Sequence, residues 1–122
     1  MPYHHLYMNL QGKRIVWGVI VFGTVLYLVI ALFVARDTEG SLGEKIQSPL
    51  VMGLYLAAAA SFLAANMVPR TLAAWFVVSL ALLETVAILG LVAALVLSDW
   101  RLILAPWLLS MAGFIRLWPA RE

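Results

Sequence analysis

The sequence predicts an all-α integral membrane bundle of four transmembrane helices, with both termini on the cytoplasmic side. Three observations lead to this fold class. Of 122 residues, 65% are hydrophobic and only 11% are charged, and the mean hydropathy is +1.01, far from the composition of soluble domains. Four long apolar runs are joined by short polar connectors, so no stretch remains that could bury a separate soluble core. The basic residues are also unevenly distributed between the two sides of the membrane.

The chain divides into an interfacial N-terminal segment (1–14), a four-helix transmembrane domain (15–118) and a short tail (119–122). The N-terminal segment has apolar residues at helical spacing and ends in Lys13 and Arg14, which suits a helix lying along the membrane surface. At about 1.5 Å per residue, each apolar run approaches or exceeds the roughly 30 Å of a hydrocarbon core. The four spans are predicted over residues 15–35, 49–68, 72–97 and 102–118.

The polar connectors and the prolines indicate how these spans are joined. The pair Ser48-Pro49 suits a helix start. Pro69 and Arg70 make a very short turn between the second and third spans, so these should form an antiparallel hairpin. Pro106 lies inside the fourth span; it should kink the helix and free the carbonyl of Leu102, which a neighbouring polar group or water can bind.

Orientation and interfacial anchoring follow from the charged and aromatic residues. Five bases fall on one side of the membrane (Lys13, Arg14, Arg70, Arg116 and Arg121) and three on the other (Arg36, Lys45 and Arg101). The richer side is assigned to the cytoplasm. Tryptophans settle at the membrane boundaries, so the expected interfacial anchors are Trp17, Trp75, Trp100 and Trp118, with Arg70 and Arg116.

Small residues recur along the second span. Gly53, Ala57, Ser61 and Ala65 follow one another at four-residue spacing and make one face nearly flat. In lipid, such a face lets a neighbouring backbone approach closely. We therefore expect a helix-packing face that is made of these four residues together with Ala81 and Ala87 of the third span.

One carboxylate, Glu84, lies in the middle of the third span. A charged side chain costs roughly 2.5 to 3.5 kcal/mol at a helix centre, so an intramembrane acid is a functional hypothesis by default. No Lys or Arg lies at that depth in the sequence, and desolvation favours the neutral acid. Glu84 is either a hydrogen-bonding staple between helices or a proton- or ion-binding group, and the sequence weighs the two equally. Its candidate partners are Thr85, Ser79, Ser61 and the carbonyl freed by Pro106.

Several classes of function are disfavoured. The chain has no cysteine, which excludes thiolate catalysis and cysteine metal sites, and no basic patch for nucleic acid. His4 and His5 are adjacent and point in different directions on a helix, so neither a metal site nor a haem at membrane depth is expected. A single glutamate does not form a catalytic cluster. We expect no catalytic residues, no metal and no cofactor.

The hairpin from Pro49 to Leu97 resembles the proteolipid c subunit of rotary ATP synthases. The likeness lies in a small-residue first helix, a cytoplasmic turn, and a second helix in which Glu84 begins the run ETVAILGLVAALVL. The resemblance implies a proton- or cation-binding carboxylate at a helix interface. The alternating glycines and the polar docking loop of that family are replaced here by GLYLAAAASFLAA and by Met67-Val68-Pro69-Arg70. The whole chain more closely resembles small four-helix bacterial membrane proteins with a c-like carboxylate helix.

Two functions from different classes remain. The first is a non-enzymatic accessory subunit that packs laterally in a larger inner-membrane complex of bioenergetic type. The second is a proton- or cation-translocating, c-like proteolipid that uses Glu84. The expected partners are the lipid bilayer and other membrane subunits or copies of the chain, with no nucleic acid. The expected location is a bacterial inner membrane.

Overall fold

α-Helices make up almost all of the described chain. A computed structural model describes residues 10–36, 40–69, 71 and 74–118, and within these residues no strand occurs. The helices, in order, are α1 (Leu10–Val34), α2 (Leu42–Ile46), α3 (Pro49–Met67), α4 (Trp75–Val96) and α5 (Arg101–Arg116). The all-helical fold class is therefore confirmed.

The helix boundaries refine the predicted ones. α1 begins at Leu10, so Lys13 and Arg14 belong to it rather than to a separate interfacial segment. α3 begins with Pro49 at its first turn, as the Ser48-Pro49 pair predicted. The short helix α2, inside the longest connector, was not predicted. Residues 1–9, Arg70 and the tail 119–122 lie outside the described residues.

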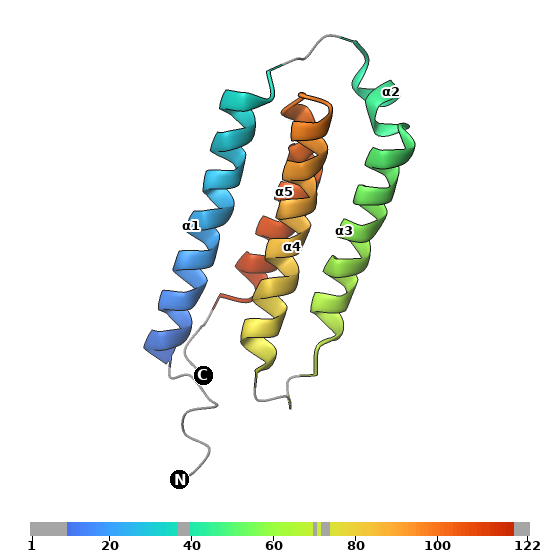
Figure 1. Cartoon of the computed structure of the whole chain (residues 1–122). Coiled ribbons are helices and arrows are strands. Elements are labelled where there is room, and N and C mark those ends of the chain that lie inside the picture. The colour runs from blue at the N-terminus through green and yellow to red at the C-terminus, as the bar shows by residue number, and fades with distance from the viewer. Residues whose placement is uncertain (1–9, 37–39, 70, 72–73, 119–122) are drawn as a thin grey trace.

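α4 lies at the centre of the bundle (Figure 1). It packs against α1, α3 and α5, whereas α1 and α3, as described, do not contact each other. Figure 1 shows α4 and α5 between the two outer helices, with the first turn of α1, the end of α3, the start of α4 and the end of α5 at one end of the bundle. The predicted hairpin of neighbouring antiparallel helices is thus formed by α3 and α4.

Among the described residues, three helices are long and apolar enough to cross a membrane: α1, α3 and α4. α5 has 16 residues, about 24 Å at 1.5 Å per residue, which is shorter than a hydrocarbon core of roughly 30 Å. Large apolar side chains cover the outside of α1, where Val19, Phe22 and Phe33 are each at least 65% exposed. Such a surface is suited to lipid rather than to water. The chain is therefore a membrane-embedded helical protein.

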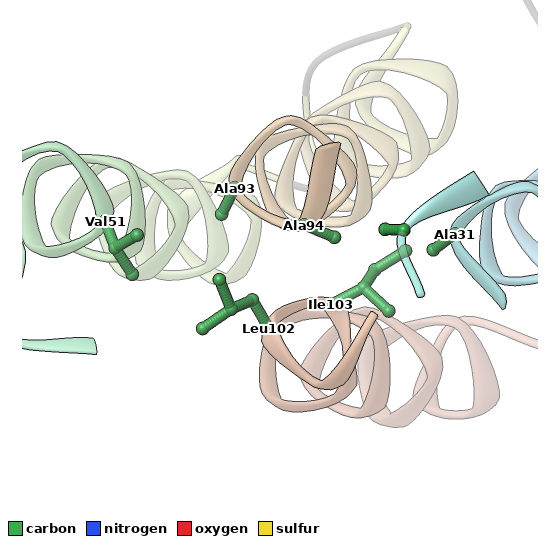
Figure 2. Close-up of a cluster of buried hydrophobic side chains, with 7 residues drawn as sticks. Ala31, Val51, Ala93, Ala94, Leu102 and Ile103 are labelled. Carbon is green, nitrogen blue, oxygen red and sulfur yellow. The ribbon is translucent and has the colours of Figure 1, made fainter. Parts of the chain in front are cut away.

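Small side chains allow the helices to approach closely inside the bundle. Figure 2 shows one of two buried clusters, in which Ala31 of α1, Val51 of α3, Ala93 and Ala94 of α4, and Leu102 and Ile103 of α5 meet. At Gly90, an added Cβ would lie 2.7 Å from Cβ of Pro106. An ordinary carbon–carbon contact needs about 3.5 to 4.0 Å. Glycine at this position is therefore what lets α4 and the proline-containing part of α5 touch.

The carbonyl freed by Pro106 receives a hydrogen bond from a neighbouring helix. The hydroxyl of Tyr55 in α3 donates to the carbonyl oxygen of Leu102, and Leu102 is fully buried. The prediction that a polar group from a neighbour would bind this carbonyl is confirmed. The same bond means that this carbonyl is not a partner of Glu84.

A buried ion-pair cluster joins the connectors at the other end of the bundle. Ser98, at φ +53°, ends α4 in the left-handed conformation, and the following amide of Asp99 donates to the carbonyl of Ala94, which is the usual pattern of a Schellman helix end. The fully buried Asp99 carboxylate accepts from the Arg101 guanidinium at 2.8 Å and from Lys45 Nζ at 2.9 Å. The Arg101 guanidinium, and then the Lys45 ammonium, hold the pKa of the Asp99 carboxyl well below its usual range, although burial opposes this shift.

Candidate functional site

The candidate site is the carboxyl group of Glu84, halfway along α4, and the phenol of Tyr27, in the second half of α1. The Tyr27 hydroxyl donates a hydrogen bond to Oε1 of Glu84 at 2.7 Å. Both residues are half-buried. Nothing in the sequence around Glu84 pointed to α1 as the helix that would supply its partner.

The bond belongs to a set that attaches α1 to the rest of the bundle. Trp17 Nε1 donates to the carbonyl of Phe114 at 2.7 Å, and Trp107 Nε1 donates to the carbonyl of Thr24 at 3.0 Å. Near the end of α1, the amide of Trp100 donates to the carbonyl of Ala35 at 2.8 Å. With the Tyr27–Glu84 bond, α1 is held at four levels. Apolar side chains of α1 add to these bonds, since Val16, Ile20 and Val21 pack against one buried cluster and Leu28 packs against the other.

The other partners considered for Glu84 are engaged or placed elsewhere. The hydroxyl of Thr85 donates to the carbonyl of Ala81 on its own helix, at 2.9 Å. Ser79 is buried, with 1% of its surface exposed, nearer to the start of α4. Ser61 on α3 is half-buried. The structure gives none of these three a hydrogen bond with Glu84 within the described residues.

The environment of Glu84 is open on one side. Along α4, Ala87 is buried but Ala81 and Ile88, which share the face of Glu84, are exposed. The described part of the chain pairs Lys45 and Arg101 with Asp99 and gives no ion pair to Glu84. Glu84 therefore lies half-buried where α1 meets α4, beside residues of α4 that are exposed.

This arrangement can bind a proton or hold two helices together. A phenol that donates to one carboxyl oxygen leaves the second oxygen to carry a proton or to accept a further bond. The described residues contain no group of three or more His, Cys, Asp or Glu that could hold a metal ion.

The predicted packing face is divided between the inside and the outside of the bundle. Ala65 and Ala87 are buried, Ser61 is half-buried, and Gly53, Ala57 and Ala81 are exposed. The buried residues of α3 are Val51, Ala58 and Ala65, so α3 meets α4 along a different line. Its glycine and alanine stripe remains largely on the outer surface.

The predicted interfacial anchors gather at the two ends of the bundle. At one end, the rings of Trp17 and Trp118 meet edge to face at 4.7 Å, and Lys13 Nζ lies 5.8 Å from the centre of the Trp75 ring. Trp100 lies beside Ala35 at the other end. Arg116 is exposed at the end of α5. Arg70 lies outside the described residues.

Sequence reasoning missed Tyr27, Tyr55 and Trp107, all of which bridge helices. A tyrosine or tryptophan at membrane depth needs a partner for its polar atom, and that rule could have singled out the three residues. No protein family model, no curated protein sequence and no solved structure matches this chain. The class that the fold defines is a membrane-embedded helical protein, with Glu84 near the middle of a helix that is long and apolar enough to cross a membrane.

Proposed function

We propose that the chain is a small non-enzymatic integral membrane subunit that packs laterally in a larger, bioenergetic-type complex of the bacterial inner membrane. Its two termini lie in the cytoplasm in this proposal, because the sequence assigns five bases to that end of the bundle and three to the other. α5 is then the fourth span, since tilt and local thinning of the bilayer accommodate a helix of about 24 Å.

The observation that carries the proposal is the outer face of α3. Gly53, Ala57, Ala60 and Ala64 are all exposed and follow one another at spacings of four, three and four residues, which places them in one stripe. An added Cβ at Gly53 would meet nothing within 4 Å. This stripe is unoccupied by any helix of the described chain.

A stripe of this kind suits a helix from another chain. Lipid tails are as apolar as leucine side chains, so helices associate in a bilayer through close backbone approach rather than through the hydrophobic effect. Large side chains would serve equally well against lipid alone, as they do on the outside of α1. The concentration of small residues on α3 therefore favours a protein neighbour on this face.

Spin labels can test whether the stripe is covered. The chain has no cysteine, so Ala57→Cys and the control Ala112→Cys each give one labelling site, and both alanines are exposed in the single chain. In the purified assembly in lipid nanodiscs, we expect the label at position 57 to be shielded from oxygen and the label at position 112 to be accessible. Equal accessibility at the two positions would refute packing through α3.

The second candidate function is proton or cation translocation by Glu84. It is favoured by the Glu84 carboxyl group being only half-buried and by its accepting, among the described residues, one hydrogen bond, from Tyr27 to Oε1. The resemblance to the c subunit hairpin supports the same role.

Glu84→Gln separates the two candidates, because the amide keeps the shape and the acceptor but does not titrate. Glu44→Gln is the matched control, since Glu44 lies exposed in α2. Under lateral packing alone, proton flux and complex activity are the same in wild type and both variants. Loss of flux in Glu84→Gln, with flux retained in Glu44→Gln, would favour translocation.

A further inference from the structure

A hollow of about 250 Å³ lies between the end of α3, the first turns of α4 and the end of α5. Its polar lining comes from Asn66, Trp75, Ser79 and Arg116, and the rest is apolar. A water molecule takes about 30 Å³ in the liquid, so the hollow can accept a group much larger than one water. It lies at the end of the bundle where Trp75 and Trp118 gather, at the level expected for lipid headgroups.

The charge around this hollow is positive. The structure gives the Arg116 guanidinium no hydrogen bond or ion pair within the described residues, and Lys13 Nζ lies 5.8 Å from the ring centre of Trp75 in the lining. The described acids lie elsewhere: Glu84 is at mid-helix, while Glu44 and Asp99 are at the opposite end. A cationic hollow without a described counter-ion attracts an anion.

The neutral groups in the lining can also donate to an anion. Ser79 lines the hollow with only 1% of its surface exposed, and its hydroxyl can donate to a group that is bound there. Asn66 uses one N–H of its amide for the carbonyl of Phe62 at 3.0 Å, which leaves the second N–H. The start of α4 has no side-chain cap, so its first amides add a partial positive charge.

We propose that this hollow binds a phosphate-type oxyanion, which is either the headgroup phosphate of an anionic phospholipid or free phosphate. Arg116 supplies the charge and a planar fork of donors, which suits phosphate oxygens. Ser79 and Asn66 supply neutral donors, and Trp75 forms the wall nearest the membrane boundary. The site rests on the hollow and its donors, and it requires neither lateral packing nor titration of Glu84.

Binding is measured by native mass spectrometry of the full chain in detergent, titrated with phosphatidylglycerol. We expect one tightly retained lipid. Arg116→Gln should weaken its binding at least about tenfold, as the loss of one charged hydrogen bond does, and Ser79→Ala about fivefold with no change of charge. Arg36→Gln removes the same charge at the opposite end and should leave binding unchanged. Far-UV circular dichroism checks that each variant keeps its helices.

Two further titrations identify the source of the oxyanion. Phosphatidylcholine tests whether net negative charge is needed, and inorganic phosphate tests whether the free ion suffices. Retention of phosphatidylglycerol over phosphatidylcholine supports a headgroup site, and retention of inorganic phosphate in place of lipid supports a site for the free ion. Absence of stoichiometric binding of both ligands would overturn the proposal, and so would equal weakening by Arg116→Gln and Arg36→Gln.

Discussion

Tyr27→Phe removes the hydrogen bond that Glu84 receives from α1 and leaves the ring in place. The bond is 2.7 Å long and joins two half-buried side chains. Hydrogen bonds between membrane helices average about 0.6 kcal/mol, with a maximum of about 1.7 kcal/mol. Because the described residues offer Glu84 no second donor, we expect a loss near the upper end, about 1.5 kcal/mol of unfolding free energy.

Glu84→Gln should cost less, about 0.5 kcal/mol or below, since the amide oxygen still accepts from the Tyr27 hydroxyl. The double variant, Tyr27→Phe with Glu84→Ala, should lose less unfolding free energy than Tyr27→Phe and Glu84→Ala lose in sum, because each single change already removes the same interaction. The free energies are measured by equilibrium unfolding in mixed micelles, followed by tryptophan fluorescence and far-UV circular dichroism.

Thr85→Val is the control for this series, because the Thr85 hydroxyl bonds only its own helix at the carbonyl of Ala81. It should change stability by less than about 0.5 kcal/mol. A Tyr27→Phe protein as stable as wild type, or strictly additive losses in the double variant, would refute the conclusion that this bond joins α1 to α4.

Three further predictions concern packing and charge. Gly90→Ala should destabilise the protein by about 1 kcal/mol, because overpacking against Pro106 outweighs the better helix propensity of alanine. The control Gly23→Ala should not destabilise it, because an added Cβ at Gly23 meets nothing within 4 Å. Thermal unfolding measures the stability of both variants. Because the folded pKa of Asp99 is lowered, its stabilisation is present above the unfolded pKa of about 3.9 and is lost as pH falls below it, so Asp99→Asn should flatten the acid limb of a stability–pH curve. Tyr55→Phe should cost about 1 to 1.7 kcal/mol in denaturant titrations, because the carbonyl that the proline of α5 leaves free loses its donor; an unchanged midpoint would contradict that assignment.

The helical fold could be predicted because it depends on composition and local pattern. Long apolar runs, the Ser48-Pro49 start and the short Pro69-Arg70 turn are local signals, and the structure has helices and a hairpin where they indicated. The fourth predicted span, 102–118, and α5, Arg101–Arg116, agree within the one or two residues by which helix ends commonly differ.

Contacts between distant segments could not be derived in the same way. Residues 27 and 84 are brought together by the placement of α1 beside α4, which hydropathy does not encode, since α3 was an equally plausible neighbour. The Asp99 cluster likewise combines a connector after α4 with Lys45 from another connector. The sequence analysis counted Lys45 only as a base on one side of the membrane, and that count did not reveal its pairing with Asp99.

The proposal of a laterally packing subunit is tested most directly by the mass of the particle that carries this chain after mild extraction from its native membrane. The chain has a mass of 13.5 kDa, and we predict a particle of several chains that becomes smaller with Ala57→Leu, while Ala112→Leu, the same change at an exposed alanine of α5, leaves the mass unaltered. A wild-type particle that contains one copy of this chain and no other protein would contradict the proposal.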